Sequence, residues 1–265
     1  MRYFICSDIH SFYDEFIKAL DKKDFNAKKD KLIVCGDLFD RGDYSVECYN
    51  FVTSLKDNFI YVKGNHEDLL NKCVMNIISE QSIASAHISN GTISTIAQFC
   101  GEETIVPFIE SRRTDNIKQK TYENMKEVLD FINQKSVNYF EVDDMIFTHG
   151  WVPTIYEDKL EVAPRSMWHD SDDFDCTPFW ETARWENGMR EWFKGAKIKG
   201  KTIVCGHWHC SYGHSVIDKK CSEFGKDAIF TPYVNDGIIA IDSRVSHSGF
   251  LNCIVYDTET RQITI

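Results

Sequence analysis

Short apolar runs that end in glycine, aspartate or histidine recur along the chain, and they constrain its fold more than any other feature. The apolar residues within these runs are continuous, which is typical of strands buried on both faces of a sheet. Segments with helical periodicity separate the first three runs. This βαβαβ order predicts an α/β fold with a parallel or mixed sheet covered by helices. The runs span residues 2–8, 31–37, 58–65, 144–150, 201–209 and 236–243.

The remaining segments predict a single domain, residues 1–265, that carries a helical insertion. Residues 67–135 contain no strong strand pattern and are expected to be mostly helical, inserted between strands of the sheet. The C-terminal segment FLNCIVYDTETRQITI predicts a hairpin that turns at residues 258–260. Residues 155–200 follow no clear period, and no repeat or change of composition divides the chain.

The composition argues against several classes of function. The 265 residues carry a formal net charge of −11, which disfavours a nucleic acid bound through its phosphates. No apolar run approaches the roughly 20 residues of a membrane-spanning helix, and the N-terminus turns charged too early for a signal peptide. Ten cysteines without a CxxC pair fit a reducing compartment. We therefore expect a cytoplasmic protein with no nucleic-acid or membrane partner.

Carboxylate, imidazole and amide side chains follow five of the apolar runs, at the point where each run ends. In α/β sheets, sites form at the carboxyl ends of the strands, so we expect these side chains to converge. A single motif is weak, since a lone histidine before glycine is more often a core or turn residue. Together, however, so many buried donors would leave like charges uncompensated unless a metal were present. The side chains that follow these runs are Asp8, His10, Asp37, Asp40, Arg41, Asn65, His66, Glu67, His149, His207 and His209.

The ordered motifs D-x-H, GDLFDRG, GNHE, H-G and G-H-x-H resemble the calcineurin-like metallophosphoesterase superfamily. Within it they are most similar to the phosphoprotein phosphatase family, especially compact bacterial and phage-type serine/threonine phosphatases and symmetrical diadenosine tetraphosphatases. The resemblance implies a four-layer α/β/β/α sandwich of two mixed sheets. Two departures stand out: Ser11 replaces the glycine that usually follows D-x-H, and GHWH carries a second histidine that many phosphoprotein phosphatases lack.

The resemblance also implies a centre of two divalent metal ions with Asp37 as the bridging ligand. Asp8 and His10 would complete the first site, with His209 as an extra ligand. The second site would be completed by Asn65, His149 and His207. This mixture of nitrogen and oxygen donors suits manganese, our first expectation, or iron, zinc or cobalt, better than calcium. Such a centre activates a bridging hydroxide for attack on phosphorus.

Three residues near these ligands are candidates for work on the substrate. Arg41 is expected to clamp phosphate oxygens through its planar fork, the alternative being a surface salt bridge. Asp40 is expected to pair with His66 and to hold it as the acid that protonates the leaving oxygen. A role for His66 as a further metal ligand competes, although Asn65 beside it fills that position in the family pattern.

The family uses a second phosphate-binding arginine from the region before the G-H motif. The candidates are Arg165, Arg184 and Arg190, and we choose Arg184 because FWETARWENG resembles the W-x-R-E pattern of the compact bacterial members. The alternative for Arg184 is a structural arginine on a helix.

These observations predict a metal-dependent phosphoric ester hydrolase that acts on a phosphorylated substrate. Our first expectation is a phosphomonoesterase for phosphoserine or phosphothreonine in proteins. The alternative is a symmetrical hydrolase of dinucleoside polyphosphates, which would use the same metal centre on a phosphoanhydride. An alternative from another class is a metal-binding scaffold without catalysis, which the complete ligand set and the presence of His66 and Arg41 disfavour.

Overall fold

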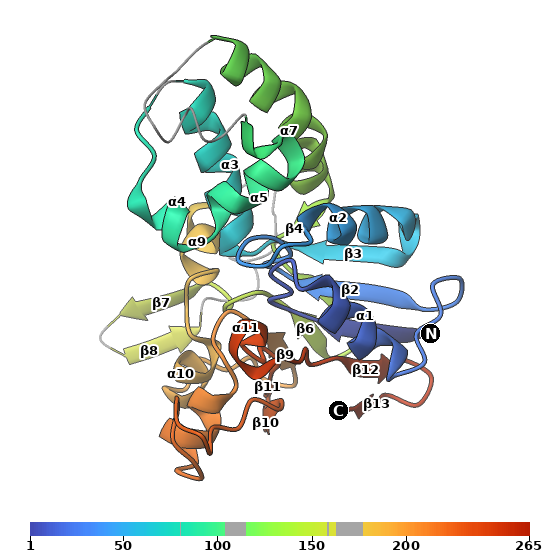
Figure 1. Ribbon diagram of the computed structural model, residues 1–265. Helices are drawn as coiled ribbons and strands as arrows, with labels where there is room; N and C mark the ends of the chain where they lie inside the picture. Colours follow the sequence, from blue (N-terminus) through green and yellow to red (C-terminus); the bar gives the residue numbers. More distant parts are fainter. Residues whose placement is uncertain (80, 104–114, 158, 163–176) are drawn as a thin grey trace.

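A computed structural model describes residues 1–79, 81–103, 115–157, 159–162 and 177–265. Two mixed sheets form its centre (Figure 1). The first sheet has the order β13 (Gln262–Thr264), β12 (Ile254–Asp257), β1 (Arg2–Cys6), β2 (Lys31–Cys35), β3 (Phe59–Val62), β4 (Ser136–Val137). The second has the order β10 (Tyr233–Asn235), β11 (Ile238–Ala240), β9 (Thr202–Cys205), β6 (Met145–Phe147), β5 (Phe140–Val142). A separate two-stranded ribbon pairs β7 (Thr154–Glu157) with β8 (Lys159–Val162).

The continuous apolar runs arise because the strands of both sheets are buried on both faces. In β1, Phe4 and Cys6 face the helices, whereas Ile5 lies in the core between the two sheets. In β9, Val204 lies in that same inter-sheet core, whereas Ile203 faces the helices on the other side. Successive side chains point to opposite faces of a strand, so burial of both faces requires every position to be apolar.

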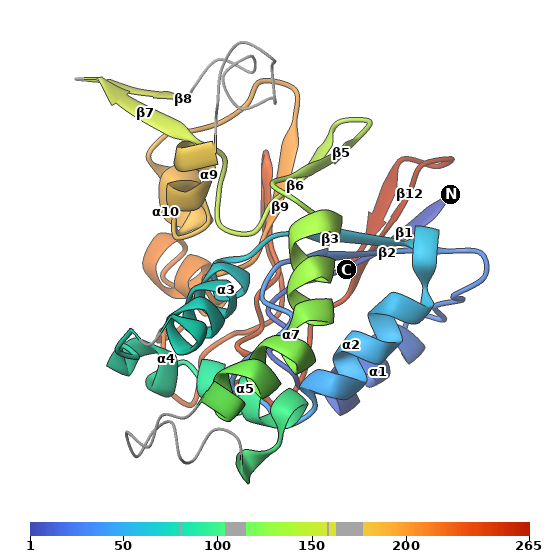
Figure 2. The ribbon, with the colours of Figure 1, turned by 90° about the horizontal axis from the view of Figure 1, so that it is seen from above.

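Helices cover the outer face of each sheet, as Figure 2 shows from above. Apolar residues of α1 (Tyr13–Asp21), α2 (Ser45–Ser54), α3 (Asn65–Ile78), α5 (Thr92–Cys100) and α7 (Asp115–Lys135) share one core with the first sheet. On the second sheet the corresponding core contains residues of α9 (Thr177–Ala183) and α10 (Gly188–Phe193). The prediction of a four-layer α/β/β/α sandwich with two mixed sheets is confirmed. Shorter helical segments are α4 (Ser85–Ser89), α11 (Val245–Ser248), a 3₁₀ turn at Lys56–Asn58 and a π-helical turn at Gly213–Ile217.

The segment predicted as a helical insertion lies between β3 and β4, and its described part is helical. In Figure 1 these helices stand above the β3–β4 edge of the first sheet. The predicted C-terminal hairpin is confirmed by the antiparallel pairing of β12 with β13. Among the residues that the structure describes, no helix has the length and apolar character needed to cross a membrane.

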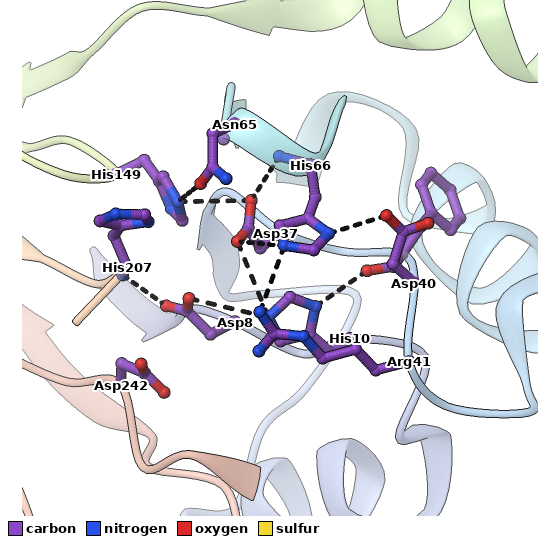
Figure 3. A network of polar contacts seen from close by, with 12 residues as sticks. Asp8, His10, Asp37, Asp40, Arg41, Asn65, His66, His149, His207 and Asp242 are labelled. Carbon is purple, nitrogen blue, oxygen red and sulfur yellow. Dashed lines mark hydrogen bonds and ion pairs between the residues drawn. The ribbon is translucent and has the colours of Figure 1, made fainter. Parts of the chain in front are cut away.

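The direction of the strands places the ends of the predicted runs together. β1, β2 and β3 run parallel to one another in the first sheet, and β6, β9 and β11 do so in the second. The loops that follow these six strands therefore leave each sheet at one edge, where the polar residues of the motifs gather (Figure 3).

Candidate metal centre

Asp37, in the loop after β2, lies at the middle of a buried cluster of histidines and carboxylates (Figure 3). Its Oδ1 is 3.3 Å from His149 Nε2. Its Oδ2 is 3.7 Å from His10 Nε2 and 3.9 Å from His66 Nε2. Two groups with metal-ligand spacing result, His10–Asp37–His66 and Asp37–His149–His207. Both groups contain Asp37, which is the arrangement that a bridging carboxylate requires.

Hydrogen bonds to backbone carbonyls fix the orientation of two of these imidazoles. His10 Nδ1 donates to the Phe39 carbonyl at 3.0 Å, and His149 Nδ1 donates to the Cys35 carbonyl at 2.8 Å. A carbonyl oxygen only accepts, so the proton of each ring is on Nδ1 and Nε2 is directed at the cluster. Such a bond is the usual support of a metal-binding histidine, because it fixes the tautomer and the plane of the ring.

The atoms around His149 Nε2 show that the cluster needs a positive charge. Asn65 Oδ1 is 2.8 Å from this nitrogen and Asp37 Oδ1 is 3.3 Å from it, so three atoms with lone pairs face one another. Burial alone would lower the pKa of His149, but the negative charge of Asp37 and its hydrogen bond raise this pKa to about 10. A proton or a metal cation satisfies this geometry, and the nitrogen and oxygen donors are those of a borderline divalent metal.

Three buried carboxylates lie close enough to repel one another. Burial raises the pKa of Asp8 well above its ordinary value, and the charges of Asp242 and Asp37 add to the rise. Burial likewise raises the pKa of Asp242 to about 6. Asp8 also stands 4.0 Å from His10 Nε2 and accepts the backbone N–H of His207 at 2.9 Å. The negative charge of these carboxylates exceeds the positive charge of the neighbouring side chains, and bound divalent cations would compensate the difference.

The surroundings of His207 favour a neutral imidazole. Burial and the adjacent His149 lower the pKa of His207 to about 3. The backbone of Trp185 hydrogen-bonds its ring, which fixes the imidazole from outside the cluster. An unprotonated nitrogen is what a metal needs from histidine.

His66 and Asp40 form a buried pair beside the cluster. The two atoms His66 Nδ1 and Asp40 Oδ2 are 2.7 Å apart. The hydroxyl of Thr92 donates to Asp40 Oδ2 at 2.9 Å, and the hydroxyl of Thr95 donates to Asp40 Oδ1 at 2.8 Å. Burial would lower the pKa of His66, but Asp37 and Asp40 raise it above the ordinary value. This pair was predicted from the sequence, whereas the two threonines on α5 that hold Asp40 were not.

Arg41 is exposed at the rim of the cluster, and its guanidinium lies beside the imidazole of His66. Its Nη2 lies 3.3 Å from His66 Nε2. Among the described residues no carboxylate forms an ion pair with Arg41, so the alternative of a surface salt bridge has no support in that part of the chain. Its guanidinium is available to an anion that approaches the metal groups.

The arginine candidates lie in different surroundings. Arg184 is buried, with Nε donating to Asp68 at 2.8 Å, Nη2 lying 2.7 Å from the same carboxylate and Nη1 donating to Asn138 at 3.0 Å. To bind phosphate, Arg184 would have to leave these partners, so its role there stays a prediction. Arg190 pairs with Glu186 and Glu191. Arg165 lies outside the described residues.

His209 belongs to neither group of possible ligands in the described part of the chain. Its Nδ1 is 2.8 Å from Ser211 Oγ, and its Nε2 is 3.4 Å from Glu223 Oε1. Its ring contacts Phe224 at a centroid distance of 5.1 Å. Burial and the charge of Arg244 lower the pKa of His209 to about 4. Its role as an extra ligand to the first site stays a prediction.

Glu67 supports the loops that carry the ligands, although the sequence reasoning gave it no role. Its carboxylate accepts the backbone N–H groups of Asp37, Leu38 and Gly64 at 2.8–3.0 Å and the hydroxyl of Tyr61 at 2.6 Å. The GNHE motif already contained this residue. Asp242 was also missed, although it follows the apolar run of β11 as the candidate ligands follow theirs.

Unusual backbone conformation concentrates at the site. Of 13 described non-glycine residues with positive φ, 7 are at or beside the cluster. Such conformations are costly and persist where the surroundings impose them, which is common at functional sites. Ser11, at the position usually held by glycine, has φ 60°, so serine adopts the turn that glycine would adopt more easily. The 7 residues are Asp8, His10, Ser11, Asp37, Asp40, Arg41 and His207.

Comparison with known proteins agrees with the geometry. A family model described as calcineurin-like phosphoesterase matches residues 1–211. The chain therefore belongs to the calcineurin-like phosphoesterase family, and its His/Asp groups are those of a metal-dependent phosphoester hydrolase.

Individual relatives match shorter stretches of the chain. The chain is 51% identical over 65 residues to a symmetrical bis(5'-nucleosyl)-tetraphosphatase of Buchnera aphidicola subsp. Acyrthosiphon pisum (strain Tuc7), covering 24% of this chain and 23% of that protein. It is 46% identical over 65 residues to the enzyme of the same name from Haemophilus influenzae (strain PittEE), with the same coverage. The matches thus span about a quarter of each relative.

A solved structure of a protein serine/threonine phosphatase from Saccharomyces cerevisiae has a TM-score of 0.52 and 14% identity. The alignment covers 96% of this chain and 72% of that chain. This likeness concerns the fold alone.

Proposed function

We propose that the chain hydrolyses dinucleoside polyphosphates symmetrically, splitting a tetraphosphate bridge into two nucleoside diphosphates. The observation that carries this proposal is the 51% identity over 65 residues to a symmetrical bis(5'-nucleosyl)-tetraphosphatase. Because that stretch covers only 24% of the chain, the substrate is our inference and goes beyond the family assignment.

The residues of the cluster divide into two proposed metal sites that share Asp37. Asp8 and His10 complete the first, and Asn65, His149 and His207 complete the second. Two divalent ions, manganese first among them, would lower the pKa of a water molecule and neutralise the phosphate oxygens when bound. Arg41 then adds two parallel N–H groups to the phosphate, which fixes the orientation of the phosphorus atom.

In the proposed reaction a water oxygen bonds to phosphorus and its proton is released to the solvent, while the P–O bond to the bridging oxygen breaks with its electron pair. His66 is positioned to give a proton to that departing oxygen. Asp40 receives the Nδ1 proton of His66 in a hydrogen bond, which leaves Nε2 for the substrate. The pair therefore sets both the direction of the ring and its charge.

A second candidate, hydrolysis of phosphoserine or phosphothreonine in proteins, is favoured by this same His66–Asp40 pair at 2.7 Å. A serine alkoxide is a strong base and leaves only with a proton, whereas a nucleoside diphosphate is a much weaker base. A buried acid of this kind is therefore more useful for an alkyl ester than for an anhydride.

One set of assays decides between the candidates. Protein loaded with Mn²⁺ is tested on diadenosine tetraphosphate, a phosphoserine peptide and an aryl phosphate, and kcat/KM is compared. We expect the highest value for diadenosine tetraphosphate, with ADP as its only nucleotide product. A higher value for the peptide would replace the proposal with the second candidate. Inactivity on all three substrates with metal bound would support a non-catalytic scaffold.

A further inference from the structure

A pocket of about 490 Å³ opens between α3 and the turn that joins α9 to α10. The lining residues come from both of these segments. Leu69 and Met75 contribute from α3, Glu181 from α9 and Trp185 from the turn. The volume lies within the ~300–1,000 Å³ that is usual for small-molecule sites. None of these side chains belongs to the candidate ligands or to the group formed by Asp40, Arg41 and His66.

Trp185 joins this pocket to the metal centre. Its ring centroid is 6.0 Å from that of His207, at an interplanar angle of 81°. Its backbone hydrogen-bonds the same imidazole. Half of Trp185 (50%) is nevertheless exposed. A large apolar ring left open to solvent directly beside a catalytic centre is a feature of ligand recognition.

The turn that carries Trp185 is held in place before any ligand arrives. Its backbone N–H donates to the Thr182 carbonyl at 2.9 Å. The preceding residue, Arg184, is anchored through Asp68 and Asn138. A ligand that stacks on the indole therefore does not have to order this segment first, which lowers the entropic cost of binding.

The other lining residues indicate what kind of group the pocket accepts. Met75 is 55% exposed and Leu69 is half-buried, so α3 brings two apolar side chains to the lining, beside the polar side chains of Asp68, Asn71 and Lys72. The carboxylate of Asp68 is already paired with Arg184 and Lys63, which leaves Glu181 opposite the single basic side chain of Lys72 among the described lining residues. The lining thus offers no excess of positive charge for a second phosphate group, and it suits a neutral, planar ring with polar edges.

We propose that this pocket binds a nucleobase of the dinucleoside polyphosphate, stacked on Trp185, while the polyphosphate runs past His207 to the metal groups. This assignment rests on the proposed function, since a simple phosphate ester has no base to place there. Trp185 is then a specificity residue for the nucleoside. It touches the part of the substrate that does not react.

The test compares ligands with and without a base on the Mn²⁺-loaded enzyme. Trp185→Ala keeps the backbone that holds His207 and removes only the ring. Stacking of a base on an aromatic side chain is worth ~1–3 kcal/mol, so inhibition of aryl phosphate hydrolysis by ADP should weaken roughly 5- to 150-fold. Inhibition by pyrophosphate should not change. Trp185→Phe should restore most of the affinity for ADP.

A matched control is Phe193→Ala, which removes another exposed aromatic ring that does not line the pocket. It should leave inhibition by both ligands unchanged. Quenching of tryptophan fluorescence by ADP gives a readout independent of activity, and it should be smaller in Trp185→Phe. If Trp185→Ala does not fold, Met75→Glu serves as the second variant, because it places a negative charge on the exposed wall of the pocket. It should weaken inhibition by ADP and leave inhibition by pyrophosphate unchanged.

Equal effects of Trp185→Ala on ADP and pyrophosphate, or no effect on either, would overturn the proposal. A selective loss for an aromatic phosphopeptide instead of ADP would overturn it in favour of a peptide site. The proposed function can fail separately: if diadenosine tetraphosphate is not hydrolysed but ADP inhibition still depends on Trp185, the nucleobase site stands and the proposed substrate falls.

Discussion

Replacement of His66 by asparagine should lower kcat most for substrates whose leaving group is strongly basic and therefore needs a proton to depart. General acid catalysis is typically worth ~10²–10⁴-fold, or about 2.7–5.4 kcal/mol of activation free energy. That loss should appear with phenyl phosphate, whose leaving oxygen is basic. It should nearly vanish with dinitrophenyl phosphate, whose leaving oxygen departs without help.

The structure also sets the size of the effect at Asp40. The carboxylate is fully buried and accepts hydrogen bonds from His66, Thr92 and Thr95. In Asp40→Asn the amide oxygen still accepts from Nδ1, but a charge-assisted bond of ~1.5–3 kcal/mol becomes a neutral one of ~0.5–1.5 kcal/mol. The difference of about 1–2 kcal/mol corresponds to a loss of roughly 5- to 30-fold on phenyl phosphate.

The assay is kcat for a series of aryl phosphates of graded leaving-group basicity, with bound metal measured for each variant. We expect a steeper dependence on leaving-group basicity in His66→Asn, a smaller steepening in Asp40→Asn, and unchanged metal content in both. Equal losses across the series with metal retained would remove His66 from the acid role. Loss of metal from His66→Asn would instead identify it as a ligand, since its Nε2 belongs to one of the two groups with ligand spacing.

Four other changes test the rest of the centre. Asp37→Asn should reduce bound metal at both sites and abolish turnover; two ions retained per chain after dialysis would contradict the bridging role. Arg41→Lys keeps the charge but loses the two-pronged bond, so kcat/KM should fall ~10- to 100-fold, about 1.4–2.8 kcal/mol, and an unchanged inhibition constant for inorganic phosphate would place Arg41 outside the pocket. Thr95→Val removes a buried donor to Asp40 at similar volume and should cost ~1–3 kcal/mol of unfolding free energy by urea titration, with an unaltered midpoint as the contrary result. Chelation of divalent ions should lower the Tm of the wild type more than that of Asp242→Asn, because the neutral side chain relieves repulsion among the buried carboxylates; equal shifts in calorimetry would refute this.

The fold followed from the sequence because local pattern and topology agree in this protein. Continuous apolar runs such as those of β1 and β9 occur where a strand has a core on each side, and the two sheets provide that for most of their strands. The ends of parallel strands meet at one edge, so the residues after each run could be expected together before any distance was known. The segment after β6 was harder, because β7, β8 and α9 have short and irregular patterns.

The contacts that could not be predicted from the sequence are made with partners far away along the chain. Arg184 is held by Asp68, 116 residues earlier, so its motif alone does not show which group takes up its N–H donors. His209 follows the motif, but its neighbours Phe224 and Ser211 could not be read from the motif, and its role as a ligand stays a prediction. The threonines on α5 meet Asp40 across 52 and 55 residues. Spacing within a motif carries no information about such contacts.

The two sheets contribute unequally to the candidate centre, and this has a consequence for stability. Loops of the first sheet supply Asp8, His10, Asp37 and Asn65, while those of the second sheet supply His149, His207 and Asp242. The core between the sheets is apolar, so closing it brings carboxylates from both sheets into one site of low dielectric. The free energy gained by packing the sheets is thus offset at this edge by repulsion, until cations bind. Because those cations would contact both sheets at once, metal affinity and the packing of the sandwich are thermodynamically linked, and each should strengthen the other.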